Sequence, residues 1–216
     1  MADVHLDTAF AGKDDDVRRK LRAGVGQAFE KAAETALERD VDAMLIAGDL
    51  FDSQRLSFPT ERVLLATLGR LEAASIPVFY ATGNHDPGKA HTRRLNLPWP
   101  KNTTVFSDPN PRTVPIHDRQ GRQVVWLTAA GHQHHGEARN LARTFPRARE
   151  DLPHVAMLHA QVLSSMGSDR HERYAPCSEL DLDRPGYVYW ALGHVHHRQG
   201  VSDRVQAWYP GNLQGR

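Results

Sequence analysis

The chain has 216 residues, of which 40% are hydrophobic and 25% are charged, and this composition excludes a wholly disordered protein. Its 27 Lys and Arg residues against 26 Asp and Glu residues give a net charge of +1, which argues against a polycationic tail and neither favours nor excludes binding to nucleic acid. The single cysteine, Cys177, excludes a disulfide framework or a thiolate metal cluster and suits a reducing compartment, so we expect a cytoplasmic protein.

Two helices and two strands are predicted in the first part of the chain. Apolar side chains recur every three or four residues over residues 14–39 and 60–74, which predicts helices there. Residues 42–47 and 76–81 form short apolar runs, which predict buried strands, and each leads into a turn that contains glycine. Strands that alternate with helices predict βαβ units and a parallel sheet, so we expect a layered α/β fold.

The rest of the chain adds strands beyond one long connection. The Pro-rich stretch of residues 97–115 is predicted to be a surface connection. Apolar runs predict four more strands, at residues 123–129, 154–159, 187–192 and 205–209. The longest apolar run, residues 187–192, is far too short to cross a membrane, so we expect no membrane partner.

Both ends of the chain look unfinished in this pattern. Asp3 and His5 follow the first methionine almost directly, with no apolar strand ahead of them to hold them. At the other end, residues 209–216 leave a predicted strand and stop in a loop. We therefore expect residues 1–216 to form one domain that is truncated at both ends, and we expect residues 1–5 to fray.

Potential metal ligands gather at the predicted strand ends. The chain has 13 histidines and almost no other soft ligands. Asp, His or Asn residues lie at strand ends in five separate segments, and open α/β sheets place their sites at the carboxyl ends of strands. The five segments are Asp3-Val4-His5, Gly48-Asp49-Leu50-Phe51-Asp52, Gly83-Asn84-His85-Asp86, His159 and Gly193-His194-Val195-His196.

The residue types in these segments favour one class of metal. Four histidines, two carboxylates and one amide form a mixed set of nitrogen and oxygen ligands, which suits Mn²⁺, Fe²⁺ or Zn²⁺ and disfavours Ca²⁺. Seven ligands with one bridging carboxylate make two positions of four ligands each, and water or hydroxide can complete each position. This layout is typical of a hydrolase with two metal ions.

The five segments together resemble, in the same order, the signature of the calcineurin-like metallophosphoesterases. The resemblance extends from Asp3 to His196 and so covers nearly the whole chain. Within that superfamily, the surrounding sequence is similar to the bacterial DNA-repair exonucleases of the SbcD and YhaO type. The similar stretches are residues 2–7, 174–177, 189–194 and 209–216. The resemblance implies a layered α/β fold with two central mixed sheets flanked by helices.

The resemblance also implies a role for each residue. Two divalent metal ions, by resemblance Mn²⁺, would share Asp49 as a bridging ligand. The other ligands would be Asp3, His5 and His196 at the first ion, and Asn84, His159 and His194 at the second. His85 would be no ligand but would protonate or stabilise the leaving oxygen. Asp52 and Asp86 would orient the ligand imidazoles and hold the loops.

By the same resemblance, the 216 residues form the nuclease domain of a DNA-repair enzyme, a 3′-to-5′ exonuclease, without the C-terminal capping domain of that branch. DNA would be the substrate, an SMC-like coiled-coil ATPase of the SbcC type would be the partner, and a homodimer stays open. Two other interpretations also stay open. The same metal pair could serve a phosphatase or a nucleotide phosphodiesterase, or the chain could be a non-catalytic module that binds DNA or an ATPase.

Several other residues have ordinary structural interpretations. His159 closes an apolar strand, where a histidine is often a hydrogen-bonded core residue, but no other histidine fills that ligand position as well. His154, at the other end of that strand, is interpreted as structural. The run His132-Gln133-His134-His135 is interpreted as a flexible polar loop, and Cys177 as a small buried side chain. Surface or rim positions are predicted for His91, His117, His171 and His197, and core positions for Tyr187, Tyr189 and Trp190.

Overall fold

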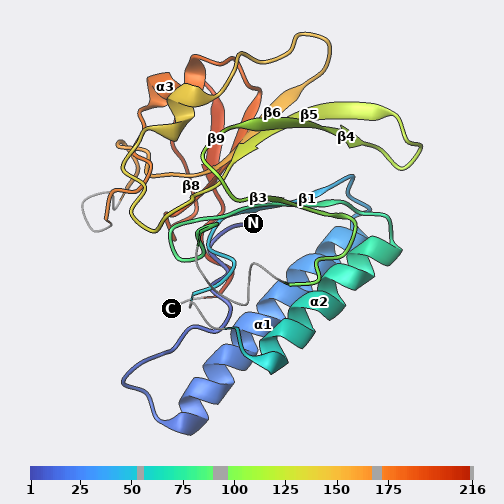
Figure 1. Ribbon diagram of the computed structural model, residues 1–216, viewed down its shortest axis with the longest axis vertical. Coiled ribbons are helices and arrows are strands. Elements are labelled where there is room, and N and C mark those ends of the chain that lie inside the picture. Colours follow the sequence, from blue (N-terminus) through green and yellow to red (C-terminus); the bar gives the residue numbers. More distant parts are fainter. Residues whose placement is uncertain (53–55, 90–96, 167–171, 215–216) are drawn as a thin grey trace.

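Two β-sheets stack on each other, and two long helices cover the outer face of the smaller one (Figure 1). The computed structural model describes residues 1–52, 56–89, 97–166 and 172–214. The predictions for His91 and His171 lie outside the described residues. The layered α/β fold expected from the sequence is confirmed.

The smaller sheet is parallel throughout, with the strand order β1 (Met44–Ala47), β2 (Val78–Ala81) and β3 (Thr103–Phe106). The helix α1 (Asp15–Glu38) precedes β1, and α2 (Phe58–Ala73) connects β1 to β2. Both helices begin at a capping side chain, because Asp14 accepts a hydrogen bond from the amide nitrogen of Val17 and Ser57 accepts one from that of Thr60. Both predicted helices are therefore present within a few residues of their expected ends.

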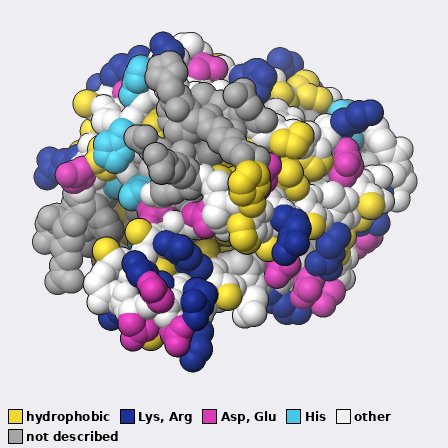
Figure 2. Space-filling view, turned by 60° about the horizontal axis from the view of Figure 1, so that its bottom comes forward, with side chains coloured by type: hydrophobic (Ala, Val, Ile, Leu, Met, Phe, Trp, Pro, Cys, Tyr) yellow, Lys and Arg dark blue, Asp and Glu magenta, His cyan; other side chains and the backbone are white. Residues whose placement is uncertain are grey.

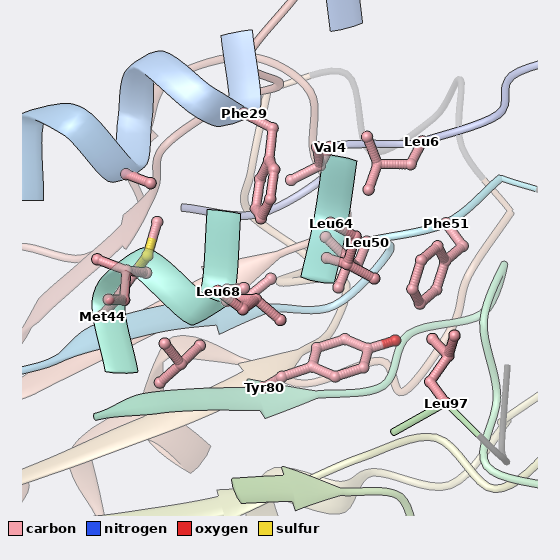
Figure 3. Close-up of a cluster of buried hydrophobic side chains, with 14 of the residues drawn as sticks. Val4, Leu6, Phe29, Met44, Leu50, Phe51, Leu64, Leu68, Tyr80 and Leu97 are labelled. Atoms are coloured by element: carbon pink, nitrogen blue, oxygen red, sulfur yellow. The ribbon is translucent and has the colours of Figure 1, made fainter. Parts of the chain in front are cut away.

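A hydrophobic core joins the helices to the smaller sheet (Figure 3). Phe29 of α1 and Leu64 and Leu68 of α2 are fully buried in it, together with Met44 of β1 and Tyr80 of β2. This packing fixes β1 and β2 against the two helices, and with them the start of the chain that follows each strand. No helix within the described ranges is both long enough and apolar enough to span a membrane.

The larger sheet has six strands in the order β4-β5-β6-β7-β9-β8, with β5, β6, β7 and β9 parallel to one another and an antiparallel strand at each edge. The strands are β4 (Arg112–His117), β5 (Gln123–Ala130), β6 (His154–His159), β7 (Tyr189–Gly193), β8 (Gln199–Gly200) and β9 (Gln206–Tyr209). All four strands predicted in this part of the chain are present. The resemblance implied that both sheets are mixed. This is correct for the larger sheet, whereas the smaller sheet is purely parallel.

The two sheets pack through small and apolar side chains. Ala47 and Phe79 of the smaller sheet are buried in one cluster with Leu127 and Met157 of the larger sheet. The outer face of the larger sheet is covered by a 3-10 turn (Leu141–Thr144), by α3 (Glu179–Asp183) and by loops. Trp190, Tyr187 and Cys177 are buried in that layer, as predicted, but Tyr189 is 36% exposed and is not a core residue.

The prediction that residues 97–115 are only a surface connection is wrong. This stretch contains β3 and most of β4. The β-branched residues Thr103, Thr104 and Val105 favour a strand, but the surrounding prolines hide that preference. Pro115 lies inside β4, which is tolerated because β4 is an edge strand and one side of it needs no backbone donor.

The prediction that residues 1–5 fray is also wrong. This segment lies along β1, on the side opposite β2. The amino group of Met1 donates a hydrogen bond to the carbonyl oxygen of Leu45 at 2.8 Å. The amide nitrogen of Ala47 in turn donates one to the carbonyl oxygen of Met1 at 2.9 Å. Val4 and Leu6 are buried in the core below the helices (Figure 3). The segment is therefore held both by backbone hydrogen bonds and by apolar contacts.

We expect the backbone amides of Asp3, His5 and Leu6 to exchange slowly with solvent deuterium. Each donates a hydrogen bond, of 3.1, 3.0 and 2.9 Å respectively, to the chain at residues 48–50 that continues β1. Hydrogen–deuterium exchange resolved by residue measures this protection, with the exposed residues 11 and 12 as the internal reference. Equal exchange rates in the two segments would support fraying instead.

Candidate metal centre

Five segments of the chain meet at one edge of the stacked sheets. In each sheet the parallel strands end at the same edge, and β1 packs against both β6 and β7 of the other sheet. The end of each strand places polar side chains at this edge. These are Asp49 after β1, Asn84 and His85 after β2, His159 at the end of β6, His194 and His196 after β7, and Asp3 and His5 from the segment beside β1.

Asp49 occupies the centre of this edge. Its carboxylate is buried, with Oδ2 3.3 Å from Nε2 of His159 and 3.9 Å from Nε2 of His5. One ligand atom each from Asp3, Asp49 and His159 lies within 4.8 Å of the other two. The backbone of Asp49 has a φ of 50°, in the left-handed region, and such strain is common at functional sites. Asp49 thus faces both halves of the predicted ligand set.

Asp3, His5 and His196 form one half of the site. One ligand atom from each residue lies within 4.8 Å of the other two. Nε2 of His196 is 3.6 Å from Oδ1 of Asp3, and the Nε2 atoms of His5 and His196 are 3.2 Å apart. The φ angles of Asp3 and His5 are 52° and 54°, so the backbone of both residues lies in the left-handed region and is not extended.

His159 and Asn84 form the other half. Nε2 of His159 lies 2.9 Å from Oδ1 of Asn84, although His159 ends β6 of the larger sheet and Asn84 follows β2 of the smaller sheet. The ring of His194 lies beside that of His159, with centroids 5.3 Å apart, but its Nε2 is 3.0 Å from the carbonyl oxygen of Glu172. The structure therefore brings His159 and Asn84 into contact, whereas Nε2 of His194 contacts the loop on the far side of the site.

This donor set fits a divalent cation. Nδ1 of His159 donates to the carbonyl oxygen of Ala47 at 2.9 Å, and Nδ1 of His5 lies 3.1 Å from Oδ1 of Asp52. In each ring the contact at Nδ1 therefore fixes the orientation, so that Nε2 points to the centre of the site, as is usual for metal-binding histidines. Nε2 of His159 faces two oxygen acceptors and Nε2 of His5 faces another imidazole nitrogen, so a proton must lie in each contact. A bound cation would take the place of these protons.

Burial and charge shift the pKa values of these groups strongly. Burial raises the pKa of the Asp3 carboxyl to about 6. Burial also disfavours the charged form of His159, but the adjacent Asp49 carboxylate outweighs it and raises the pKa of this imidazole to about 9. The imidazoles around Asp49, His159 first among them, hold the pKa of its carboxyl well below the usual range despite burial. The buried carboxylates thus depend on nearby positive charge, which a divalent cation would supply.

Asp52 and Asp86 hold other groups and do not enter the centre. Oδ1 of Asp52 lies between two imidazoles, 3.1 Å from Nδ1 of His5 and 2.9 Å from Nδ1 of His85. The carboxylate of Asp86 accepts hydrogen bonds from the amide nitrogens of Gly83 at 2.6 Å and of Phe51 at 3.1 Å. Asp52 thus contacts two imidazoles, whereas Asp86 contacts the backbone of the chain after β1 and after β2.

A pocket of about 320 Å³ opens onto this edge. Its lining includes three residues that the sequence did not place in the site, His135, Glu172 and Tyr174. Nδ1 of His135 donates to the carbonyl oxygen of Asn84 at 2.7 Å, and its Nε2 lies 3.1 Å from the hydroxyl group of Tyr174. The sequence analysis noted residues 174–177 only as a stretch similar to the exonuclease branch, and nothing in the residue types singled out Tyr174 as a site residue. In Figure 2 the histidine side chains gather mainly on one side of the face, whereas Lys and Arg lie among Asp and Glu.

Residues 132–135 form a loop, as predicted, and His134 and His135 are exposed, but His132 does not lie on its polar surface. His132 is fully buried, its Nε2 donates to the carbonyl oxygen of His159 at 2.7 Å, and burial lowers its pKa to about 4. The position of this run directly after β5 pointed to the correct rim, but its contacts are with residues far away in sequence. His154 is structural, as predicted, because it bonds to Thr128 and to the amide nitrogen of Arg149.

Gly83 should not tolerate a side chain. A Cβ at this position would lie 2.2 Å from Oδ1 and 2.8 Å from the backbone nitrogen of Asp49, so Asp49 would have to move. We expect Gly83→Ala to lower the free energy of unfolding by about 1–3 kcal/mol and to weaken the binding of divalent cations strongly. Thermal denaturation and calorimetric titration with Mn²⁺ measure these effects. Gly69→Ala in α2, where a Cβ meets nothing within 4 Å, is the matched control. Unchanged Mn²⁺ binding by Gly83→Ala would contradict this placement of Asp49.

Comparison with known proteins gives one family match. The profile of the calcineurin-like phosphoesterases matches residues 1–198. Among curated proteins, the chain is 31% identical over 219 residues to the "uncharacterized metallophosphoesterase YhaO" of Bacillus subtilis, an alignment that covers 100% of this chain and 52% of that protein.

Two further relatives have names that refer to DNA repair or to nuclease activity. The chain is 30% identical over 223 residues to the "DNA double-strand break repair protein Mre11" of Aeropyrum pernix, which covers 99% of the chain and 52% of the relative. It is 27% identical over 207 residues to a subunit of the nuclease SbcCD of Rhodobacter capsulatus, which covers 78% of the chain and 51% of the relative. The chain therefore spans about half the length of these relatives.

Proposed function

Because the chain belongs to the calcineurin-like phosphoesterase family, we propose that it is the catalytic domain of a metal-dependent phosphodiesterase that acts on DNA. The resemblance first seen in the five segments is confirmed by this membership and by the relatives from the DNA-repair branch. One observation carries the proposal. Carboxylate, imidazole and amide groups from both sheets converge around the buried carboxylate of Asp49 at the mouth of a pocket.

Two divalent cations would bind at this edge. Asp49 would contact both, with Asp3, His5 and His196 completing the first position and Asn84, His159 and His194 the second. When bound, such a pair lowers the pKa of a coordinated water and neutralises charge on the phosphoryl oxygens. Mn²⁺ suits the mixed set of nitrogen and oxygen ligands. His194 would bind through Nδ1, or would give up the contact between its Nε2 and Glu172.

His85 would deliver a proton to the leaving oxygen. Its amide nitrogen donates to Oδ1 of Asp49 at 2.9 Å, so the backbone of His85 is anchored at the centre of the site. Its Nδ1 lies 2.9 Å from Oδ1 of Asp52, so proton transfer to a substrate would fall to Nε2. A carboxylate behind the ring stabilises the imidazolium form that a general acid needs. The imidazole also lines the pocket, where 37% of its side chain is exposed.

The relatives support DNA as the substrate. One is named for the repair of DNA double-strand breaks and another as part of a nuclease. We propose that the chain removes nucleotides from DNA in the 3′-to-5′ direction. We further propose that the protein works with a coiled-coil ATPase of the SbcC type, as the name SbcCD suggests for that relative.

The test compares three substrates with the 216-residue chain, with Mn²⁺ and with EDTA. The substrates are single-stranded DNA labelled at either end, a cyclic nucleotide and an aryl phosphomonoester. We expect hydrolysis of DNA that requires Mn²⁺ and releases a 3′ label first. Hydrolysis of the cyclic nucleotide or the monoester with DNA intact would favour another phosphoesterase. Uptake of Mn²⁺ without hydrolysis of any substrate would favour a non-catalytic module.

A further inference from the structure

We infer that His132 is a positioning residue, which sets the separation between Asn84 and His159 by holding the ends of two different sheets together. The inference rests on the proposed function, because it concerns two proposed ligands of the same metal centre. Asn84 follows β2 in the smaller sheet, whereas His159 ends β6 in the larger sheet. Hydrogen bonds within either sheet therefore do not set the 2.9 Å between Nε2 of His159 and Oδ1 of Asn84.

The side chain of His132 supports the end of β6. The pairing of β5 with β6 ends at Ala130 and Leu158, so the carbonyl oxygen of His159 lies one residue beyond the last pair. Nε2 of His132 donates to this oxygen at 2.7 Å. Because a carbonyl oxygen can only accept, Nε2 must carry the proton. The imidazole thus replaces the backbone donor that a longer β5 would provide.

The backbone of His132 holds both ends of the loop that carries Asn84 and His85. Its amide nitrogen donates to the carbonyl oxygen of Thr82 at 2.9 Å, and its own carbonyl oxygen accepts from Oγ1 of Thr82 at 2.8 Å. The same carbonyl oxygen accepts from the amide nitrogen of Gly88, also at 2.8 Å. Thr82 precedes the loop and Gly88 follows it. A single residue therefore contacts the loop of Asn84 through its backbone and the end of β6 through its side chain.

Packing alone does not account for a histidine at this position. The side chain is fully buried, and among the described residues its Nδ1 has no hydrogen-bond partner. A buried nitrogen without a partner costs about 1–3 kcal/mol, which a leucine at this position would not incur. The proton on Nε2 is therefore the property of this side chain that the structure uses.

His154 provides a matched control on the same strand. It is also a buried histidine, at the other end of β6 from the metal centre. Its Nε2 contacts Oγ1 of Thr128 at 2.7 Å, and its Nδ1 accepts from the amide nitrogen of Arg149 at 2.9 Å. His154→Leu removes a buried hydrogen-bonding imidazole from β6 without touching the contact to His159.

The experiment titrates metal-free protein with Mn²⁺ in a calorimeter and records its melting temperature in EDTA. His132→Leu removes the donor, whereas His132→Gln carries an amide nitrogen near the position of Nε2. We expect His132→Leu to bind Mn²⁺ at the position of Asn84 and His159 about 10–100-fold more weakly than the parent does. His132→Gln should recover most of this loss of affinity. His154→Leu should lower the melting temperature and bind both ions as the parent does.

Three results would overturn the inference. The first is equal Mn²⁺ affinity of His132→Leu and the parent. The second is an equal loss in the leucine and glutamine variants, since the hydrogen bond would then not be the cause. The third is an equal loss in His154→Leu, since any destabilisation of β6 would then suffice. A parent chain that binds no Mn²⁺ would overturn the proposed function itself, and the inference with it.

Discussion

Replacement of Asp49 by alanine should remove both metal ions at once and reduce the hydrolysis of DNA by about 10³-fold or more. The reason is geometric, because Oδ2 of Asp49 lies 3.3 Å from Nε2 of His159 in one half of the site and 3.9 Å from Nε2 of His5 in the other. Each proposed metal position would lose an anionic ligand in the same step. Elemental analysis after dialysis against Mn²⁺ measures the metal content, and cleavage of end-labelled DNA measures the activity.

Two further variants separate this effect from a loss of folding. Asp49→Asn keeps the shape of the side chain but removes its charge, so this variant should also bind less metal. Its melting temperature in EDTA shows whether the metal-free chain still folds. Asp118→Asn is the control, because this carboxylate accepts hydrogen bonds from the amide nitrogens of Gln120 and Arg122 in the turn between β4 and β5. The variant should keep both ions. Two equivalents of bound Mn²⁺ in Asp49→Ala would refute the bridging role.

Replacement of His85 by glutamine should leave both metal ions in place and slow the hydrolysis of DNA by about 10²–10⁴-fold. His85 is proposed as an acid and not as a ligand, and its Nδ1 is engaged with Asp52 at 2.9 Å. The loss should depend on the leaving group. An alkoxide that leaves from DNA needs a proton, whereas a nitrophenolate that leaves from an aryl phosphodiester does not, so the second substrate should be affected far less. Rates on both substrates at saturating Mn²⁺ test this dependence.

The outcome for His85→Gln distinguishes three roles. Fewer bound ions than in the parent would mean that the imidazole coordinates metal. An equal loss on both substrates would mean that it acts on the phosphoryl group and not on the leaving oxygen. His117→Gln, on the exposed face of β4, is the matched control and should change neither measurement.

Periodicity predicted most elements of this fold because their apolar residues are close together in sequence. Both long helices and the strands β1, β2, β5, β6, β7 and β9 lie within a few residues of their expected positions. The strands β3 and β4 were missed because they lie in a proline-rich stretch and are only partly buried. Their existence depends on β2 and β5, to which they pair, and not on any strong local preference.

The contacts of the N-terminal segment show a second limit of local patterns. Residues 1–5 have no periodic apolar run, so the sequence predicted fraying. In the structure the amino group of Met1 contacts Leu45, and the amide nitrogen of His194 donates to both carboxylate oxygens of Asp3 at 3.1 Å. These partners are 44 and 191 residues away in sequence. No local pattern contains that information.

The order of residue types along the chain indicated which polar residues follow the strands, and through them the family and most residues of the candidate site. Parallel strands of one sheet end at a common edge, so Asp49 and Asn84 had to lie close together once the smaller sheet formed, whereas His159 ends a strand of the larger sheet. The way in which the two sheets are joined at that edge depends instead on contacts between residues far apart in sequence. His132 and His135 hold the site through carbonyl oxygens of His159 and Asn84, 27 and 51 residues away in sequence. Any residue can provide a backbone carbonyl, so such a contact leaves no trace in the residue types and arises only when the two sheets pack together.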